Sequence, residues 1–276
     1  MRSLKCNVVL VFGAFCLVPP AHAQEAQSNP SLSKTWVVDA GVAYRRLDGD
    51  LSAITSGGKG GGYDFGRLGL DDHDTSVSAD LHWRISKAWR LDLGYDGIST
   101  KGLIDNHASL DFGRITIPTG YELSSSLDVQ TYSAFLGYTF TQSHDFELGG
   151  RLGLNVIDAN ASVSGRAFAG NKEVSAGPEY VSKTTLVPTL GLYATYAFDD
   201  RLAFEGSIDG IAGSLGSNSG HYVQMSAGLK YWLTDSFALG AGYSYLSNKI
   251  EHDGSTIDSG LEVRSHTGYL KASLGF

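Results

Sequence analysis

The chain lacks the features of a helical membrane protein, a disulfide-stabilised protein and a nucleic-acid-binding protein. After the first two dozen residues no stretch approaches 18 consecutive apolar residues, so no transmembrane helix is expected there. The only cysteines, Cys6 and Cys16, lie within that first stretch. No basic run is present and the net charge is −8, which argues against nucleic acid as a partner. The 35 glycines, 14 tyrosines and 12 phenylalanines favour strands and turns over helices.

Residues 1–23 have the pattern of a signal peptide. A short basic start precedes an apolar run over residues 8–18, which is too short for a permanent membrane helix. Ala21 and Ala23 supply the small residues that a signal peptidase needs, so the mature chain is predicted to begin at Gln24. A chain cleaved there contains no cysteine, which excludes disulfide and thiolate chemistry.

The rest of the chain shows period-two alternation. In one segment the apolar residues Leu81 and Trp83 alternate with Asp80, His82 and Arg84. We count ten such segments, an even number, and eight if poorly defined ones are merged. The pattern predicts an all-β protein. It is either a soluble sandwich or barrel with the apolar face inside, or a transmembrane antiparallel up-and-down β-barrel with that face in lipid.

The connections between the segments alternate in length, which favours the transmembrane barrel. Outer-membrane barrels have short turns on the periplasmic side and long loops outside the cell. The short connections lie near Lys87 and at 142–144, 199–200 and 234–236, and the long ones at 53–73, 100–120, 158–180, 212–220 and 248–262.

Aromatic residues gather at the two ends of the apolar faces. From Trp36 to Tyr44 is eight steps, about 26 Å along a strand and about 19 Å after a tilt near 45°. That span fits between the two aromatic girdles of a membrane barrel. The predicted girdle residues are Trp36, Trp83, Trp89, Phe140, Phe146, Phe198, Phe204, Tyr231 and Phe237 beside the short turns, and Tyr44, Tyr95 and Tyr243 at the other end.

Two segments change phase along their length. Leu127 and Val129 occupy odd positions, whereas Tyr132 and the apolar residues after it occupy even ones. A similar change occurs near residue 264. Either β-bulges lie near 130 and 264, or the strands leave the membrane there and no longer follow its pattern.

The polar face of a membrane barrel lines its lumen, and here that face carries both signs of charge. A barrel of eight to ten strands has little free bore, and buried charges must be paired. We therefore expect a network that fills the lumen. Its predicted members are Asp39, Arg45, Asp80, Arg84, Arg90, Asp92, Asp96, Glu147, Arg151, Glu205, Asp209, Lys230 and Lys271.

Candidate catalytic and metal sites are weak. Asp80 and His82 have the Asp-x-His spacing, and Asp72 and Asp74 the Asp-x-Asp spacing, that resemble the omptin outer-membrane proteases. The first pair falls on the periplasmic side, where a surface protease would not place it, and the second has no identifiable partner pair. The eight histidines form no HxxxH or HxH pair. We expect no catalytic residues, no metal and no cofactor.

The final strand ends on an aromatic residue, Phe276, with Leu274 and Leu270 at alternating positions before it. Together with the signal peptide and the paired amphipathic strands, this pattern resembles the small outer-membrane β-barrel proteins of Gram-negative bacteria, of the OmpA-like or OmpW-like kind. The resemblance implies a barrel over residues 35–276, a short periplasmic segment at 24–34, and insertion machinery that reads the terminal strand.

The expected function follows from these features. The leading hypothesis is an outer-membrane barrel with a plugged polar lumen and exposed loops, which serves a structural or surface-interaction role. The alternatives are a narrow passive pore for small solutes and, less favoured, a surface enzyme acting on lipid A or peptides. The expected partners are outer-membrane lipids with lipopolysaccharide, the insertion machinery and an unknown surface ligand.

Overall fold

The computed structural model describes residues 29–55, 60–64, 72–106, 110–112, 115–117, 121–169, 172–215, 218–252 and 257–276. The predicted signal peptide, residues 1–23, lies outside the described residues, as do residues 24–28 of the predicted periplasmic segment.

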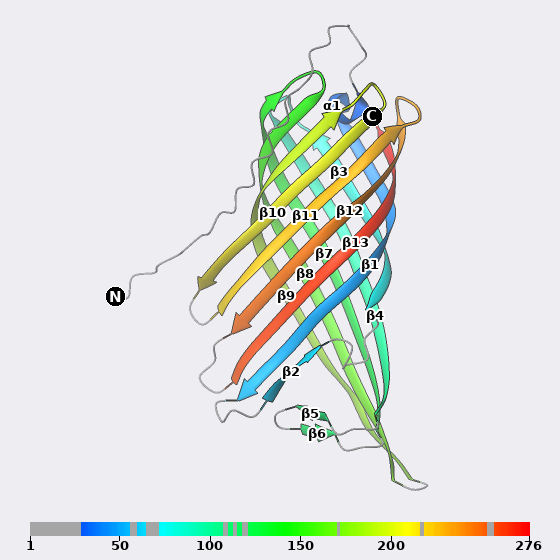
Figure 1. Cartoon of the computed structure of the whole chain (residues 1–276), viewed down its shortest axis with the longest axis vertical. Helices are drawn as coiled ribbons and strands as arrows, with labels where there is room; N and C mark the ends of the chain where they lie inside the picture. The colour runs from blue at the N-terminus through cyan, green and yellow to red at the C-terminus, as the bar shows by residue number, and fades with distance from the viewer. Residues whose placement is uncertain are drawn as a thin grey trace, which may run out of the picture.

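Ten antiparallel strands form a closed barrel (Figure 1). The first strand pairs with the last, from Val37 opposite Gly275 to Thr55 opposite Ile257, so the barrel wall has no edge at this seam. The predicted fold and the count of ten strands are therefore confirmed. The barrel strands are β1 (Trp36–Thr55), β3 (His73–Arg84), β4 (Trp89–Asn106), β7 (Tyr121–Gln142), β8 (Phe146–Ala169), β9 (Lys172–Ala197), β10 (Leu202–Leu215), β11 (Asn218–Trp232), β12 (Phe237–His252) and β13 (Ile257–Gly275).

Four short elements lie outside this set. β2 (Gly60–Asp64) pairs with β1, and β5 (Leu110–Phe112) pairs with β6 (Ile115–Ile117). The helix α1 (Pro30–Ser33) begins after Asn29, whose side chain accepts a hydrogen bond from the backbone N–H of Ser31 at 2.9 Å. Over the described part of the chain, no helix is long and apolar enough to cross a membrane.

The two ends of the barrel differ in the length of their connections. At one end, the end of α1 in Figure 1, strands join through short turns at 85–88, 143–145, 198–201 and 233–236. At the other end the strands extend to different distances. The total lengths of β7, β8 and β9 are 22, 24 and 26 residues, whereas β10 has 14. The segment 158–180, predicted as a long loop, consists mainly of the ends of β8 and β9.

The predicted bulges near 130 and 264 are wrong. β7 pairs with β4 and β8 without interruption through Gln130, and β13 pairs with β12 and β1 without interruption through Arg264. The register shifts instead lie at Thr139/Thr141 in the β7–β8 pair and at Val163/Gly165 in the β8–β9 pair. The phase changes of the apolar residues therefore belong to strands that continue beyond the aromatic girdle, where lipid no longer selects one face.

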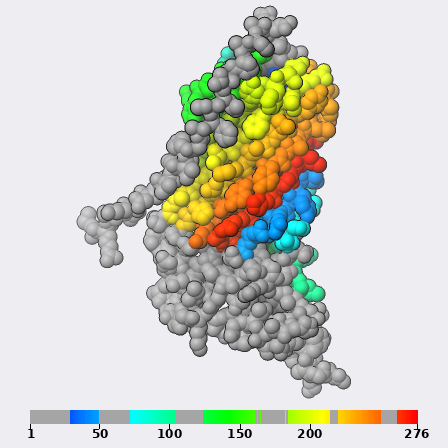
Figure 2. Space-filling view, in the orientation of Figure 1, coloured from blue at the N-terminus to red at the C-terminus, as the bar shows by residue number. Residues whose placement is uncertain are grey.

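The barrel is apolar outside and polar inside. Outward residues such as Val42, Leu190 and Leu270 are 52%, 51% and 62% exposed, whereas inward Glu147 and Ser273 are fully buried. This is the reverse of a soluble barrel and suits an outer surface in hydrocarbon. Figure 2 shows part of this outer wall, where β10 to β13 and β1 lie side by side as tilted bands.

The aromatic residues sit on this outer face in cross-strand pairs. Trp36 stacks on Trp83 with 4.7 Å between ring centroids, and Trp89 meets Tyr138 edge-on at 5.0 Å. The outward positions beside the short turns hold Trp36, Trp83, Trp89, Phe140, Phe146, Phe198, Phe204, Tyr231 and Phe237, and those toward the other end hold Tyr44, Tyr95 and Tyr243. Phe276, Leu274 and Leu270 also face outward and are 67%, 48% and 62% exposed.

Candidate functional site: a charged belt across the lumen

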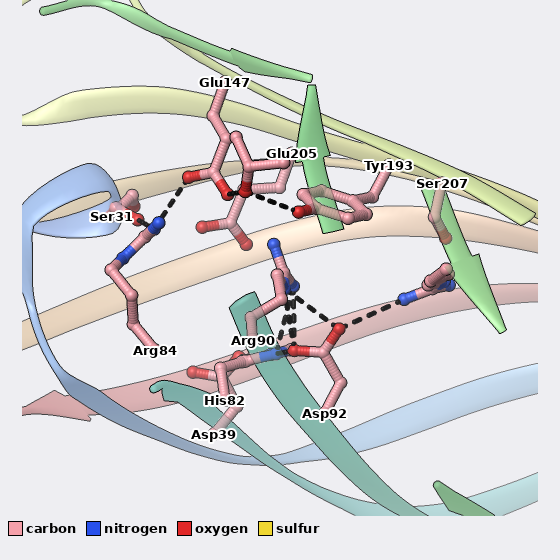
Figure 3. Close-up of polar contacts among 12 residues, drawn as sticks. Ser31, Asp39, His82, Arg84, Arg90, Asp92, Glu147, Tyr193, Glu205 and Ser207 are labelled. Atoms are coloured by element: carbon pink, nitrogen blue, oxygen red, sulfur yellow. Dashed lines mark hydrogen bonds and ion pairs between the residues drawn. The ribbon is translucent and has the colours of Figure 1, made fainter. Parts of the chain in front are cut away.

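Inward side chains from six of the ten strands meet in one group of charges, which we call the charge belt. Each member alternates with a lipid-facing residue, so the same alternation that builds the wall delivers the charge. Figure 3 shows part of this group. The charge belt consists of Asp39 (β1), His82 (β3), Arg90 and Asp92 (β4), Arg151 (β8), Glu205 and Asp209 (β10), and Lys230 (β11).

Lys230 connects strands that are not neighbours in the wall. Its Nζ lies 3.2 Å from Asp39 Oδ2 and 3.1 Å from Glu205 Oε2. β12 and β13 separate β11 from β1, so the contact to Asp39 spans the interior. The side chain of Lys230 is only 7% exposed, and that of Asp39 only 4%. Both charges are thus held by pairing, since an unpaired buried charge would be strongly unfavourable.

His82 lies between two carboxylates (Figure 3). Its Nδ1 is 2.8 Å from Asp92 Oδ1, and its Nε2 is 3.4 Å from Asp39 Oδ2. Both partners are acceptors, so a ring that satisfies both contacts carries a proton on each nitrogen and a positive charge. Asp92 also receives Arg90, whose Nε lies 3.0 Å from each carboxylate oxygen. His82 therefore links the Arg90 side of the belt to the Lys230 side.

Arg151 completes the belt. Its guanidinium donates to both carboxylate oxygens of Asp209, with Nε 2.6 Å from Oδ1, and its Nη1 lies 3.6 Å from Asp92 Oδ2. Its guanidinium carbon lies 4.4 Å from the centroid of the Phe135 ring. In the same way Arg90 lies 4.2 Å from the centroid of Tyr193. Both arginines are thus packed against aromatic rings and held in place as well as paired.

A second layer closes the lumen at the short-turn end. Arg84 Nη2 lies 2.7 Å from Oε2 of Glu147, which is fully buried and accepts a hydrogen bond from the Thr139 hydroxyl at 3.0 Å. That hydroxyl is in turn 2.8 Å from the hydroxyl of Tyr193. β4 and β7 separate β3, which carries Arg84, from β8, which carries Glu147, so this ion pair also spans the interior.

The helix α1 covers this layer. The indole N–H of Trp232 donates to Ser31 Oγ at 3.0 Å, and the side-chain amide of Asn29 donates to the carbonyl of Asp199 at 2.9 Å. Arg84 also reaches the carbonyl of Ser31 at 3.5 Å, and Leu32 is only 3% exposed. Residues 29–34 thus pack into the mouth of the barrel at the short-turn end.

The remaining predicted lumen charges form two separate pairs. Arg45 Nη2 lies 2.6 Å from Asp96 Oδ2, and its Nε donates to the Thr267 hydroxyl at 3.0 Å. Lys271 pairs with Asp80 and lies over the ring of Tyr269 at 4.9 Å. The structure therefore brings seven of the thirteen predicted charges into the belt, two into the layer beneath it and four into these pairs.

Sequence reasoning missed the uncharged part of the plug. Tyr193, Thr139 and Trp232 all occupy inward positions, which alternation alone could have identified. The packing of α1 into the mouth of the barrel could not be predicted in this way, because a helix of four residues is too short to show a periodic pattern in the sequence. Of the Asp-x-His pair, Asp80 is engaged by Lys271, and His82 belongs to the belt.

No protein-family model and no curated protein sequence matches the chain. Solved structures do match. The outer-membrane protease OmpT from Escherichia coli aligns over 87% of this chain and 97% of its own, with a TM-score of 0.56 and 10% identity. OprG from Pseudomonas aeruginosa aligns over 91% and 98% (TM-score 0.41, 12% identity), and Ail of Yersinia pestis over 86% and 98% (TM-score 0.31, 11% identity).

At such identities the likeness concerns the fold. The apolar outer face and the aromatic pairs independently require a lipid environment, and the short turns then mark the periplasmic end. Together these observations indicate the bacterial outer membrane as the location, and the chain has the fold of its small β-barrel proteins.

Proposed function

We propose that the protein is a closed outer-membrane barrel that acts through its extracellular surface rather than by conducting solutes or by catalysis. The observation that carries the proposal is a set of buried ion pairs inside the barrel that join strands separated in the wall by one or two others. Lys230 with Asp39, Arg84 with Glu147 and Arg151 with Asp209 each join strands that are not adjacent in the wall. Such pairs place side chains in the lumen, which would have to be filled with water in a conducting pore.

The energetic case for closure is that these charges hold one another in place. Breaking one partner of a buried pair costs about 3–5 kcal/mol, because it leaves an uncompensated charge. The belt shares its members, since Asp39 contacts both His82 and Lys230, and Asp92 contacts His82 and two arginines. Opening a path past them would therefore break several pairs together. The cap formed by α1 adds a second obstruction at the periplasmic mouth.

The placement of the omptin-like residue pairs supports the proposal over a surface enzyme. Asp80 and His82 are engaged by Lys271, Asp39 and Asp92 inside the barrel. At the other end of β3, Asp74 is buried and Asp72 is exposed. A pair split in this way does not present two carboxylates to one substrate.

The test is single-channel recording on the mature chain refolded in detergent and inserted in a planar bilayer. We expect no discrete current steps from a barrel whose folded state is verified by heat-modifiability on gels. The triple variant Arg84→Ala/Arg90→Ala/Arg151→Ala should show steps or a lowered unfolding temperature. The matched control Arg46→Ala/Arg201→Ala/Arg264→Ala removes three exposed arginines and should behave as wild type. Discrete steps from the folded wild-type barrel would contradict closure and favour the narrow pore.

A further inference from the structure

Three basic side chains form a row on the outer face of the wall, next to the extracellular aromatic girdle. Arg46 of β1 lies directly opposite His73 of β3 on one side and His266 of β13 on the other. All three are exposed and alternate with buried neighbours such as Arg45 and Thr267, so they point away from the lumen. We call Arg46, His73 and His266 the basic row.

The basic row lies at the depth of the lipid head groups. Arg46 is two residues beyond Tyr44 of the outer girdle, about 6.6 Å along the strand and about 5 Å after a tilt near 40°. Because of the same tilt, directly opposite residues on neighbouring strands differ in depth by about 3 Å, so His73 and His266 remain close to this level. The polar region on each side of a bilayer is about 5–7 Å thick. The basic row therefore faces the head groups of the outer leaflet.

Tyrosine rings hold both histidines of the row in place. The hydroxyl of Tyr243 lies 2.5 Å from Nδ1 of His266, and the ring of Tyr245 lies 5.1 Å from the same imidazole. When that hydroxyl donates, Nε2 of His266 carries the N–H and is a donor toward a ligand. The ring of Tyr44 lies 5.5 Å from that of His73 at the other end of the row. The two imidazoles are thus positioned on either side of one guanidinium.

The acidic side chains nearest to the basic row lie farther from the membrane. Asp48, Glu262 and Asp72 each come farther out on the same three strands. Asp48 Oδ2 lies 3.8 Å from Arg46 Nε, and both side chains are more than half exposed, so this pair contributes little. Glu262 is instead paired with Arg264, and Asp72 is 3.6 Å from the histidine of its own segment. A guanidinium carries five N–H donors, so one such contact leaves most of them available.

We propose that the basic row binds a phosphate group of an anionic glycolipid in the outer leaflet. Guanidinium and imidazole N–H groups donate strongly to phosphate oxygens, and here three such side chains lie on three adjacent strands. Like charges directly opposite one another repel, and an anion between them relieves that repulsion. The depth of the row favours a phosphate carried by a lipid, because acyl chains hold it at that level. The site lies outside the lumen and so goes beyond the proposed function.

The net charge of the chain argues that such binding is local. At −8 the protein as a whole repels a phosphorylated lipid, so a preference for the phosphorylated form requires a specific cluster of donors. The same charge makes the experiment sharp, since general electrostatic attraction cannot imitate the result.

The test measures the binding of diphosphorylated lipid A to the folded barrel in a non-ionic detergent by native mass spectrometry. We expect Arg46→Gln to weaken binding about fivefold or more, and His266→Phe, which keeps a ring between the tyrosines, to weaken it about threefold. The matched control Arg201→Gln removes an exposed arginine of a periplasmic turn and should stay within about twofold of wild type. Lipid A without its phosphates should bind wild type as weakly as the phosphorylated lipid binds Arg46→Gln.

Equal binding of the dephosphorylated lipid to wild type would overturn the proposal, and so would equal binding of lipid A to Arg46→Gln. Competition by inorganic phosphate at millimolar concentration would overturn the assignment to a lipid, since the site would then take phosphate from solution. The comparison of the two lipids needs no variant, so it decides the matter even if a variant fails to fold. Current recordings in bilayers without glycolipid report only on the lumen, so failure of this proposal is distinguishable from failure of the closed barrel.

Discussion

The contact between Arg151 and Asp209 offers a quantitative test of the charge belt. Arg151 donates to both carboxylate oxygens of Asp209, and the two side chains are 12% and 1% exposed. We expect Arg151→Met to lower the free energy of unfolding by about 3 kcal/mol, because it leaves the Asp209 carboxylate buried without its cation. Asp209→Asn should cost about 1–2 kcal/mol, since Asp92 still lies 3.6 Å from the guanidinium.

The double variant Arg151→Met/Asp209→Asn separates pairing from packing. It removes both charges and fills nearly the same volume, so we expect it to be within about 1 kcal/mol of wild type. The coupling energy of the cycle should then be about 2 kcal/mol or more. The control cycle, Arg46→Met with Asp48→Asn, removes a pair 3.8 Å apart whose side chains are 60% and 52% exposed, and its coupling should stay below about 0.5 kcal/mol.

The measurement is equilibrium urea unfolding of the folded barrel in detergent, followed by the fluorescence of its 4 tryptophans. A coupling below about 0.5 kcal/mol for the belt pair, equal to that of the exposed pair, would refute the reasoning. The belt would then be a set of independent contacts with water between them, and the case for a closed lumen would lose its energetic basis.

Three further variants probe other parts of the barrel. Gly153→Ala should cost about 1–3 kcal/mol in urea unfolding, because a Cβ there would lie 2.1 Å from the aromatic ring opposite, whereas Gly268→Ala meets nothing within 4 Å and should be neutral. Trp232→Phe removes the hydrogen bond to α1, so proteolysis at the N-terminus should accelerate while the barrel keeps its heat-modifiability. Asp199 lies in a turn outside the membrane, and its carboxylate accepts hydrogen bonds from the backbone N–H groups of Arg201 and Leu202. These bonds lower the pKa of Asp199 from its ordinary value of 3.8. Its stabilising effect is therefore present above about pH 4 and is lost below it as the carboxylate is protonated, so Asp199→Ala should destabilise the barrel at pH 7 more than at pH 3.

The fold could be predicted from the sequence because lipid imposes one rule on every strand. Val42 faces outward and Asp39 faces the lumen because one position is even and the other odd. The strand register keeps outward residues next to outward residues all around the closed barrel. The rule ends where the lipid ends. Tyr132 contacts Tyr95 of the girdle, and beyond it lipid no longer selects one face of the strands. Alternation therefore no longer marks a strand there, and the sequence predicts a loop for the segment 158–180, which forms the ends of β8 and β9.

The candidate site was predictable as a set of inward charges but not as a network. Alternation places Lys230 and Asp39 inside, yet nothing in the sequence indicates that they meet across two intervening strands. That contact depends on the circumference of the barrel, which is fixed only when β13 closes on β1. The same closure forms the mouth into which α1 packs, so neither feature has a local signal.

The filling of the lumen depends on glycine as much as on charge. At six places a large inward side chain lies over a glycine directly opposite it on the next strand, where a Cβ would be only 2.0–2.7 Å from that side chain. These glycines act by leaving space, since each large side chain can cross toward the centre only where its neighbour has no Cβ. The filling of the lumen therefore depends both on the inward side chain and on the glycine opposite it on the neighbouring strand. This explains why many of the glycines lie within strands rather than in turns. The pairs are Gly41 with Lys271, Gly137 with Arg90, Gly149 with Tyr193, Gly153 with Phe135, Gly191 with Asp209, and Gly242 with Tyr269.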